Sequence, residues 1–335
     1  MKERESNFEL LRCIAMIMVV LLHCNYFVLG NVVSVEIETN PLGSFWRMFA
    51  DQLCTPCVNL FILISGWFGI NPKLKGGLSL LFQVIFYTVL SIGICFMMDW
   101  DISFEKIKAS LTSQQGYWFI WPYLLLYITS PALNLLVEKA PLRIGGGIIA
   151  SLLIFEFSLD WIVYYSGGGG GKSYIAFVTL YLIARMMATH DFKVTHYKRY
   201  IYLGLFILMS LLPTIIAFWG EQCIHFQFGK SAYTNPFVIV ASVSLMLWFS
   251  KMHFVSKFIN WLACSSFSIY LLHMNPLIAG HFKEIMLVTN DLVGTNIVAY
   301  TFVAVGITLL LSLACICMDK IRIFIWNKIG SVSRN

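Results

Sequence analysis

The sequence predicts an all-α membrane protein, a polytopic bundle of about ten transmembrane helices with both termini in the cytoplasm. Three observations lead to this prediction. The chain has 335 residues, of which 59% are apolar and only 12% are charged, and its mean hydropathy is +0.77. A soluble domain carries about 25% charged residues. Apolar runs of spanning length recur along the chain, and Lys and Arg are divided unevenly between the segments that join these runs.

Each apolar run is predicted to form one helix, because about 20 consecutive apolar residues are needed to cross the hydrocarbon core of a bilayer. No linker, low-complexity segment or block of charge separates the runs, so residues 1–335 are predicted to form a single domain. The sixth and eighth runs are the shortest. The ten runs cover residues 8–29, 52–70, 78–98, 117–137, 144–165, 173–189, 199–219, 235–250, 258–280 and 296–318.

The orientation in the membrane is predicted from the basic residues. With a cytoplasmic N-terminus, 16 of the 23 Lys and Arg residues fall in inner segments, 6 fall in outer segments, and Arg12 lies within the first run. An excess of Lys and Arg marks cytoplasmic segments, so we expect a multi-pass protein of the cell (inner) membrane with its N-terminus inside. Lys2 and Arg4 precede the first run as in a signal peptide, but no small-residue cleavage site follows, and the segment is predicted to be retained.

Several other functions are disfavoured. The net charge of +6 does not indicate a nucleic-acid partner, because the basic residues are dispersed and form no extended patch. The nine cysteines lie mostly inside apolar runs, as packing residues do, and the Cys54 and Cys57 pair lacks the βαβ context of a redox motif. Segment 166–173 resembles a phosphate-binding loop, but Ser166 replaces its first glycine. We predict no metal and no bound cofactor.

The first run carries ionisable residues that a plain membrane anchor avoids. Arg12 and His23 are 11 residues apart. At about 100° and about 1.5 Å per residue, they fall within about 20° of the same helix face and about 16 Å apart. Glu9 lies three residues before Arg12 and shares that face. These three are the candidate catalytic residues.

A second polar stripe occurs in the ninth run. Ser266, Tyr270 and His273 have the i, i+4, i+7 spacing that brings side chains to one helix face. Trp118 in the fourth run and Tyr174 in the sixth enter the membrane from the outer side. These five residues are predicted to line an outer vestibule that binds an acceptor, or to form a structural polar cluster. For Trp118, an aromatic belt at the membrane interface is a further alternative.

A cationic mouth is predicted at the inner side. Arg12, Arg185, Lys73 and Lys75 lie near the cytoplasmic ends of their runs, where they could bind a phosphate-bearing ligand. The alternative is that Arg185 and the two lysines only follow the positive-inside rule.

Four segments together resemble the membrane-bound acyltransferase 3 family. Residues 8–12 (FELLR) followed by His23 are similar to its arginine and histidine motif in the first span. Residues 58–66 (VNLFILISG) are similar to its phenylalanine-rich run ending in Ser-Gly. Residues 117–119 (YWF) are similar to its Trp-Phe entry to a middle span, and 266–273 (SFSIYLLH) to its late Tyr and His span. The family's acidic residue is commonly aspartate, whereas this chain has glutamate.

The resemblance implies transfer of an acyl group, usually acetyl, from cytoplasmic acyl-CoA to a hydroxyl group of a saccharide or lipid-linked glycan, with separate glycan-assembly proteins as possible partners. Arg12, assisted by Arg185 or Lys73, would hold the CoA phosphates. His23 would act as general base, because imidazole exchanges protons near neutral pH. Glu9 would orient Arg12 through a salt bridge.

A transporter or flippase for a lipid-linked saccharide is the alternative function, with the polar stripe of the first run as its path. Transporters of this kind tend to contain internal repeats with broken helices at matching positions. Residues 1–165 and 166–335 show no convincing repeat. A non-catalytic scaffold would leave the ionisable stripe without a purpose.

Overall fold

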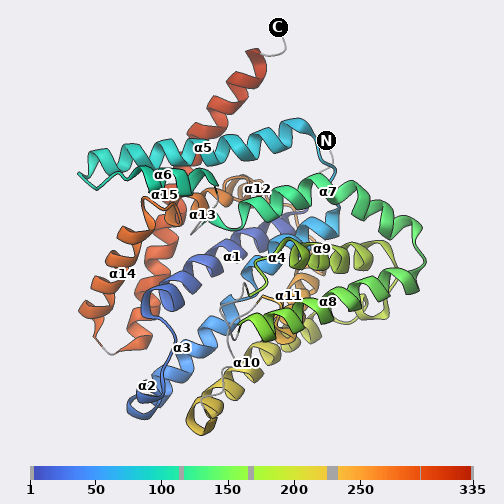
Figure 1. The fold of residues 1–335 in the computed structure, drawn as a ribbon, viewed down its shortest axis with the longest axis horizontal. Helices are drawn as coiled ribbons and strands as arrows, with labels where there is room; N and C mark the ends of the chain where they lie inside the picture. The colour runs from blue at the N-terminus through green and yellow to red at the C-terminus, as the bar shows by residue number, and fades with distance from the viewer. Residues whose placement is uncertain (1–3, 113–116, 165–169, 225–232, 295, 333–335) are drawn as a thin grey trace. The chain divides into compact units, whose positions relative to one another are not determined.

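The computed structural model describes residues 4–112, 117–164, 170–224, 233–294 and 296–332 (Figure 1). Every regular element in these residues is a helix, as predicted. The chain divides into two compact units. The first unit comprises Met1–Pro72 and Pro122–Val255, and the second comprises Lys73–Trp121 and Ser256–Asn335. The assignment of residues 1–335 to one domain stays a prediction.

The first unit is built on α1, which continues without a break into a π-helical turn, η1. Its elements are α1 (Ser6–Leu22), η1 (His23–Phe27), α2 (Ser34–Thr39), α3 (Pro41–Cys54), α4 (Cys57–Phe68), α7 (Ile120–Lys139), α8 (Leu142–Tyr164), α9 (Tyr174–Thr189), the short 3-10 turn η3 (Lys193–Thr195), α10 (Arg199–Ile224) and α11 (Pro236–Ser250).

Helix α1 with η1 runs antiparallel to α3 and α4 along its whole length. The Phe8 ring lies 4.9 Å from the Phe68 ring at one end, and Asn25 Nδ2 lies 2.8 Å from Asp51 Oδ1 at the other. Both segments span 17 residues between these contacts, from 8 to 25 and from 51 to 68. The two antiparallel segments therefore keep the same register along their packing. In this register Ser65 lies opposite Leu11, the residue that precedes Arg12 in the sequence.

The packing of α4 on α9 depends on one glycine. A Cβ on Gly66 would lie 2.4 Å from the carbonyl oxygen of Tyr181 and 3.0 Å from Ala184 Cβ. Only a residue without a side chain lets the two backbones approach this closely. The close contact holds the end of α4 against the later half of α9, where Arg185 lies.

Helices α4, α9 and α11 of the first unit run in the direction opposite to α1. The start of α1 meets the end of α11, where Asn7 Nδ2 donates to the carbonyl of Phe249 at 3.0 Å. Near the opposite end, Asn59 Nδ2 donates to the carbonyl of Tyr233 at 2.9 Å, and the Tyr233 amide donates to Gly170. We call these the Arg12 end and the His23 end. Most of the glycine-rich segment lies outside the described residues.

In its described residues, the second unit contains two long helices and four shorter ones. They are α5 (Leu74–Met97), α6 (Phe104–Thr112), α12 (Lys257–Ala263), α13 (Phe267–His273), α14 (Ala279–Val293) and α15 (Ile297–Val332). A buried ion pair on α15 ties it to α5: Arg322 bonds both carboxylate oxygens of Asp319, which also accepts a hydrogen bond from the Tyr87 hydroxyl at 3.0 Å.

The prediction of one helix over the ninth run, 258–280, is wrong. The structure has two helices of seven residues there, α12 and α13, joined by a turn. In this turn the amides of Ser265 and Ser266 bond the carbonyls three residues back, and the Ser266 hydroxyl bonds the carbonyl of Ala263. Serine hydroxyls compete in this way for helix carbonyls. Pro276, which has no amide hydrogen, prevents the helix from continuing.

Two of the segments that join the predicted apolar runs are largely helical. Residues 30–46 contain α2 and the start of α3, and residues 281–295 mostly belong to α14. Asn40 caps α3 by accepting a hydrogen bond from the Gly43 amide at 3.1 Å, and Pro41 occupies the first turn. This combination of cap and proline favours a helix start.

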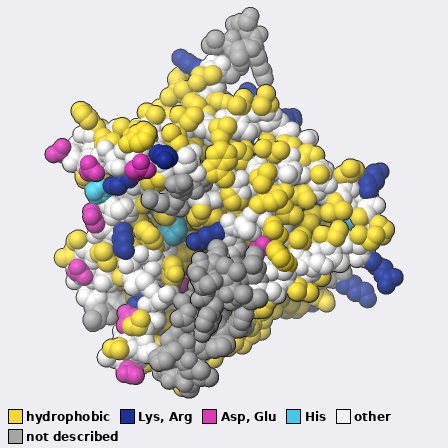
Figure 2. Space-filling model, in the orientation of Figure 1, with side chains coloured by type: hydrophobic (Ala, Val, Ile, Leu, Met, Phe, Trp, Pro, Cys, Tyr) yellow, Lys and Arg dark blue, Asp and Glu magenta, His cyan; other side chains and the backbone are white. Residues whose placement is uncertain are grey.

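In the part of the chain that the structure describes, six helical stretches are long and apolar enough to cross a membrane. Many large apolar side chains are exposed, and Figure 2 shows a surface that is mostly hydrophobic on the visible face. The chain is therefore a multi-pass membrane protein, while the count of ten and the orientation stay predictions. The six are Ser6–Phe27, Pro41–Phe68, Leu74–Met97, Ile120–Lys139, Arg199–Gly220 and Ile297–Ile329.

Candidate functional site

The Arg12 end of α1 carries a close ion pair. Arg12 Nη1 lies 2.6 Å from Glu9 Oε1, and Arg4 Nη1 lies 3.9 Å from the other oxygen of this carboxylate. The Glu9 side chain is only 7% exposed, whereas the Arg12 side chain is 32% exposed. Glu9 is thus enclosed and anchors Arg12, while part of the guanidinium stays open to an anion.

His23 lies where the helix changes from α to π. Its amide donates to the carbonyls of Val19 and Val20, so the backbone is continuous from Arg12 to His23. The His23 side chain is half-buried, and its ring lies 6.1 Å from the ring of Phe27. The 11-residue separation on one helix therefore holds, with a rise of about 16 Å between the two residues.

A polar network that the sequence analysis missed holds the turn after His23. Asn25 Nδ2 bonds the carbonyl of Arg47 at 3.0 Å and Asp51 Oδ1 at 2.8 Å. Arg47 bonds back to Asn25 Oδ1 at 3.3 Å, to the Gly30 carbonyl at 2.9 Å and to Glu36 at 2.9 Å. The i, i+4 spacing of Arg47 and Asp51 is the one signal in the sequence, and both residues lie between the first two predicted apolar runs.

Arg185 lies at the Arg12 end, on the last turns of α9. Its guanidinium lies against the backbone of Gly69, where an added Cβ would come within 2.7 Å of Nη1. The positive φ of Gly69, 71°, also favours glycine. Arg185 Nη2 is 3.6 Å from Glu138 Oε1, and Arg185 Nε is buried without a hydrogen-bond partner among the described residues. Arg185 therefore has hydrogen-bonding capacity left for an anion.

The chain beyond α4 is fixed by a second set of hydrogen bonds. The Ile70 amide donates to the Tyr181 hydroxyl at 2.9 Å, which donates to Asn134 Oδ1 at 2.7 Å. Asn134 Nδ2 returns to the Ile70 carbonyl at 2.9 Å. Because α7 and α9 both hold this segment, the backbone beneath Arg185 is fixed in place.

Two further polar side chains lie inside the first unit. The hydroxyls of Ser65 and Tyr123 are 3.2 Å apart, level with the Arg12 region of α1. Asn59 is fully buried, and its Oδ1 has no hydrogen-bond partner among the described residues. Tyr233, in the connection before α11, is half-buried, and desolvation raises the pKa of its hydroxyl, which therefore stays protonated.

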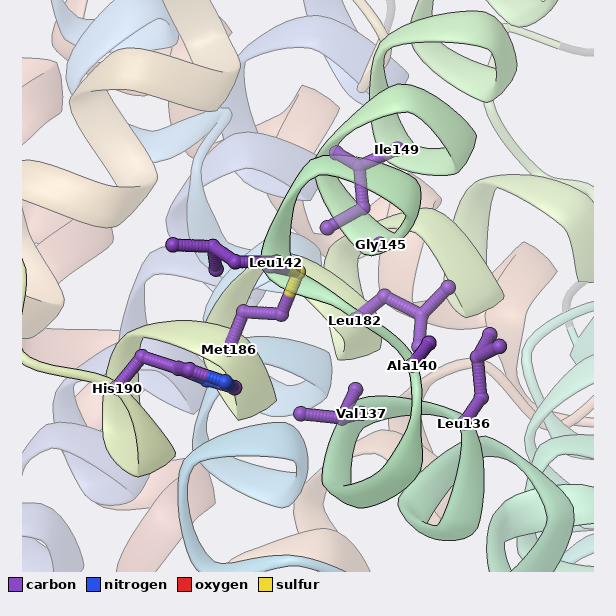
Figure 3. Close-up of a pocket in the computed structure, with 9 residues that line it drawn as sticks. All are labelled: Leu136, Val137, Ala140, Leu142, Gly145, Ile149, Leu182, Met186 and His190. Atoms are coloured by element: carbon purple, nitrogen blue, oxygen red, sulfur yellow. The ribbon is translucent and has the colours of Figure 1, made fainter.

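An apolar crevice lies between residues of α7, α8 and α9 (Figure 3). His190, at its edge, bonds Thr189 through Nδ1 at 3.0 Å. The crevice contains no converging set of polar groups, so it is packing between helices rather than a reaction site. Its lining residues are Leu136, Val137, Ala140, Leu142, Gly145, Ile149, Leu182, Met186 and His190.

The five residues predicted to line an outer vestibule belong to different units. Tyr174 lies in the first unit, where its hydroxyl donates to Thr129 Oγ1 at 2.8 Å. The other four lie in the second unit. There Ser266, Tyr270 and His273 are all buried, and the rings of Tyr270 and His273 are 6.5 Å apart.

His273 has buried surroundings. Its Nδ1 bonds the carbonyl of Ile269 within the same helix, and its ring packs against Phe282 at 5.6 Å. Trp118 packs on Phe119, but its neighbour Tyr117 makes the stronger contact with this region. The Tyr117 hydroxyl bonds the Leu271 carbonyl and accepts a hydrogen bond from Asn275 at 2.9 Å. Trp118 was predicted as the functional residue of this pair, but Tyr117 is the fully buried one.

Lys73 belongs to the second unit, where it is the N-cap residue of α5, whereas Arg12 and Arg185 belong to the first unit. No three His, Cys, Asp or Glu side chains come together as metal ligands within the described ranges. The candidate site in the first unit is thus helix α1, with the Arg12 guanidinium near its start and the His23 imidazole at its end.

Comparison with known proteins adds one finding. The model of a family described as an acyltransferase domain, acyltransferase 3, matches residues 5–317 of the 335. No curated protein and no solved structure gives a significant match. The matched region includes α1 with both Arg12 and His23, and it extends into α15.

Proposed function

Because the chain belongs to the acyltransferase 3 family and is a membrane acyltransferase, we propose that it moves an acyl group, acetyl in the simplest case, from cytoplasmic acyl-CoA to a hydroxyl group of a cell-surface or lipid-linked saccharide. The observation that carries this proposal is the continuous helix from Glu9 to His23. A partly open guanidinium at one end and an imidazole at the other suit a long, charged donor whose reactive group lies far from its phosphates.

The donor phosphates bind at the Arg12 end. Arg12 is supported by its ion pair with Glu9, and Arg185 contributes a guanidinium lying on the Gly69 backbone. Guanidinium groups bind phosphate through two parallel hydrogen bonds. Lys73, at the start of α5 in the second unit, stays a donor-binding candidate from the sequence alone. The flexible pantetheine arm then extends the remaining distance of about 16 Å along α1.

Transfer takes place beside His23. The imidazole accepts the proton of the acceptor hydroxyl as the oxygen attacks the thioester carbonyl carbon. The carbon–oxygen bond of the new ester forms and the carbon–sulfur bond breaks. The CoA sulfur leaves with the electron pair of that bond and receives the proton, so the products are an ester and a thiol. Tyr174 is the proposed acceptor-side residue of the first unit, and Trp118, Ser266, Tyr270 and His273 are acceptor candidates in the second unit.

The test uses purified full-length protein in detergent or vesicles, with acetyl-CoA and a saccharide acceptor, and measures thiol release and acetylated product. We expect His23→Ala to lower kcat by about 10²–10⁴-fold, because a positioned general base contributes that much. His253→Ala, at an exposed histidine outside the helices, is the matched control. A wild-type rate in His23→Ala at equal protein level would refute the role of His23.

A second readout separates catalysis from transport. If the wild-type protein moves a labelled lipid-linked saccharide across a vesicle membrane and releases no thiol from acetyl-CoA, the chain is a transporter and the donor assignment fails. Acetylated product that depends on His23 supports the transferase.

A further inference from the structure

The segment after His23 has an uncommon backbone. Residues His23–Phe27 form a π-helical turn, and the Val28 amide donates to the carbonyl of His23, five residues back. A π turn is less favourable than an α turn, and such turns occur mostly as single insertions at functional sites. Contacts from elsewhere in the fold must therefore stabilise it.

Asn25 provides the central contact. Its side-chain nitrogen, Nδ2, donates to the Arg47 carbonyl and the Asp51 carboxylate. Its side-chain oxygen, Oδ1, accepts a hydrogen bond from Arg47 Nε. The side chain of Asn25, two residues after His23, is thereby bonded three times, all to α3.

Arg47 closes the same segment at its far end. Its Nη2 bonds the carbonyl of Gly30 at 2.9 Å, and its Nη1 bonds Glu36 on α2 at 2.9 Å. Arg47 is buried, with 9% exposure, and hydrogen bonds made by a charged group are stronger than those between neutral groups. The chain from Asn25 to Gly30 is therefore held at both ends by a single residue of α3.

We propose that Asn25, Arg47 and Asp51 are positioning residues for His23. They hold the π turn against α3, which keeps the imidazole at a constant place relative to Arg12 on the same helix. This inference rests on the proposed function of His23. None of the three touches the reacting atoms; they act on the reaction through the backbone that carries His23.

The kinetic test compares variants of the full-length protein with acetyl-CoA as donor. Asn25→Ala should lower kcat by about 10-fold to 100-fold, the effect of misplacing a catalytic group by about 1 Å. KM for acetyl-CoA should stay within about twofold, because the phosphates bind at the Arg12 end. Asp51→Asn keeps a side-chain oxygen that accepts the hydrogen bond from Asn25, so this variant should retain most of the wild-type kcat. Asp51→Ala removes this acceptor, so its kcat should fall as in Asn25→Ala.

Asn40→Ala is the matched control, because it removes the hydrogen bond that caps α3 without touching the π turn. Its kcat should stay within about twofold of wild type, since its effect is on helix stability. If Asn25→Ala does not fold, Arg47→Lys replaces it: the lysine keeps the charge but cannot reach Asn25, Gly30 and Glu36 together.

A structural readout is independent of activity. Backbone hydrogen exchange over residues 23–30 should increase in Asn25→Ala or Arg47→Lys, while exchange over residues 9–12 should not. If wild-type protein transfers no acetyl group, the proposed function fails, and the exchange result alone still decides whether this network holds the turn.

Three results would overturn the inference. The first is unchanged kcat together with unchanged exchange over residues 23–30. The second is a raised KM with constant kcat, which would place the network in donor binding. The third is an equal loss in Asp51→Asn and Asp51→Ala, which would mean that the carboxylate charge matters and not the hydrogen bond to Asn25.

Discussion

Glu9 and Arg12 show how a charge is accommodated in an apolar helix. Neither group is isolated, because the carboxylate and the guanidinium are 2.6 Å apart with Arg4 nearby. An unpaired charge in a membrane helix is costly, and pairing reduces the cost. Because Glu9 is enclosed and Arg12 is not, the pair presents its positive side outward, where an anionic donor would bind.

Arg12→Lys tests this assignment. Lysine keeps the charge but loses the planar fork that binds phosphate through two hydrogen bonds. We expect KM for acetyl-CoA to rise about tenfold, equivalent to about 1.4 kcal/mol, with kcat nearly unchanged. The measurement is steady-state thiol release by purified protein.

Arg4→Lys is the control for this experiment, because Arg4 is more exposed and lies 3.9 Å from the same carboxylate. Its KM should stay close to wild type. Equal KM values for Arg12→Lys and the wild type would show that Arg12 serves as a topological charge and not as a phosphate ligand.

At the scale of elements, helix α4 links α1, which carries Arg12, with α9, which carries Arg185. It lies along α1, and it packs closely on α9 through Gly66. Arg12 and Arg185 thus reach the same end of the first unit from two different helices because α4 lies between them. The tight α4 and α9 contact is consequently part of the proposed donor site.

Gly66→Ala should weaken this contact. The new methyl group would lie 2.4 Å from a backbone oxygen of α9, and that oxygen cannot move away without moving the helix. We expect a loss of stability of about 1–3 kcal/mol, typical of overpacking, and a raised KM for the donor. Thermal unfolding of the detergent-solubilised protein measures the first effect.

The matched control is Gly147→Ala in α8, where an added Cβ meets nothing within 4 Å. Alanine is the better helix former, so this variant should be stabilised by about 0.5–1 kcal/mol. Equal unfolding temperatures for the two variants would contradict the close packing of α4 on α9.

At the scale of the whole molecule, the first unit has two chemically different ends. The Arg12 end has the guanidinium groups of Arg12 and Arg185, of which Arg12 is the more exposed, and the His23 end has the network around Asn25. With the predicted cytoplasmic N-terminus, the Arg12 end would face the proposed acyl-CoA donor in the cytoplasm, and His23 would lie in the outer half of the membrane.

Reporter fusions test this orientation. Green fluorescent protein fused after Asn335 should fluoresce, and alkaline phosphatase at the same place should be inactive, because both termini are predicted to be cytoplasmic. Phosphatase fused after Asp101, in a predicted outer segment, should be active. The opposite pattern would put the Arg12 end outside and exclude a cytoplasmic donor.

The candidate site could be proposed from the sequence because its three residues lie on one continuous segment. The spacing of Glu9, Arg12 and His23 needs only helical geometry, and α1 supplies it over its full length. The Asn25 and Arg47 network could not be predicted in the same way. Its members come from separate elements, and no periodic pattern links an amide at 25 with a guanidinium in a predicted loop.

The sequence by itself determined the membrane character, the all-helical fold, the acyltransferase 3 family and the cation and imidazole on one helix. All of these depend on composition, local periodicity or short motifs. Only the tertiary structure decided that the ninth run breaks into α12 and α13, that Gly69 supports Arg185, and that a π turn held by α3 carries His23. The reason is physical: these features depend on hydrogen bonds and close contacts between residues distant in sequence.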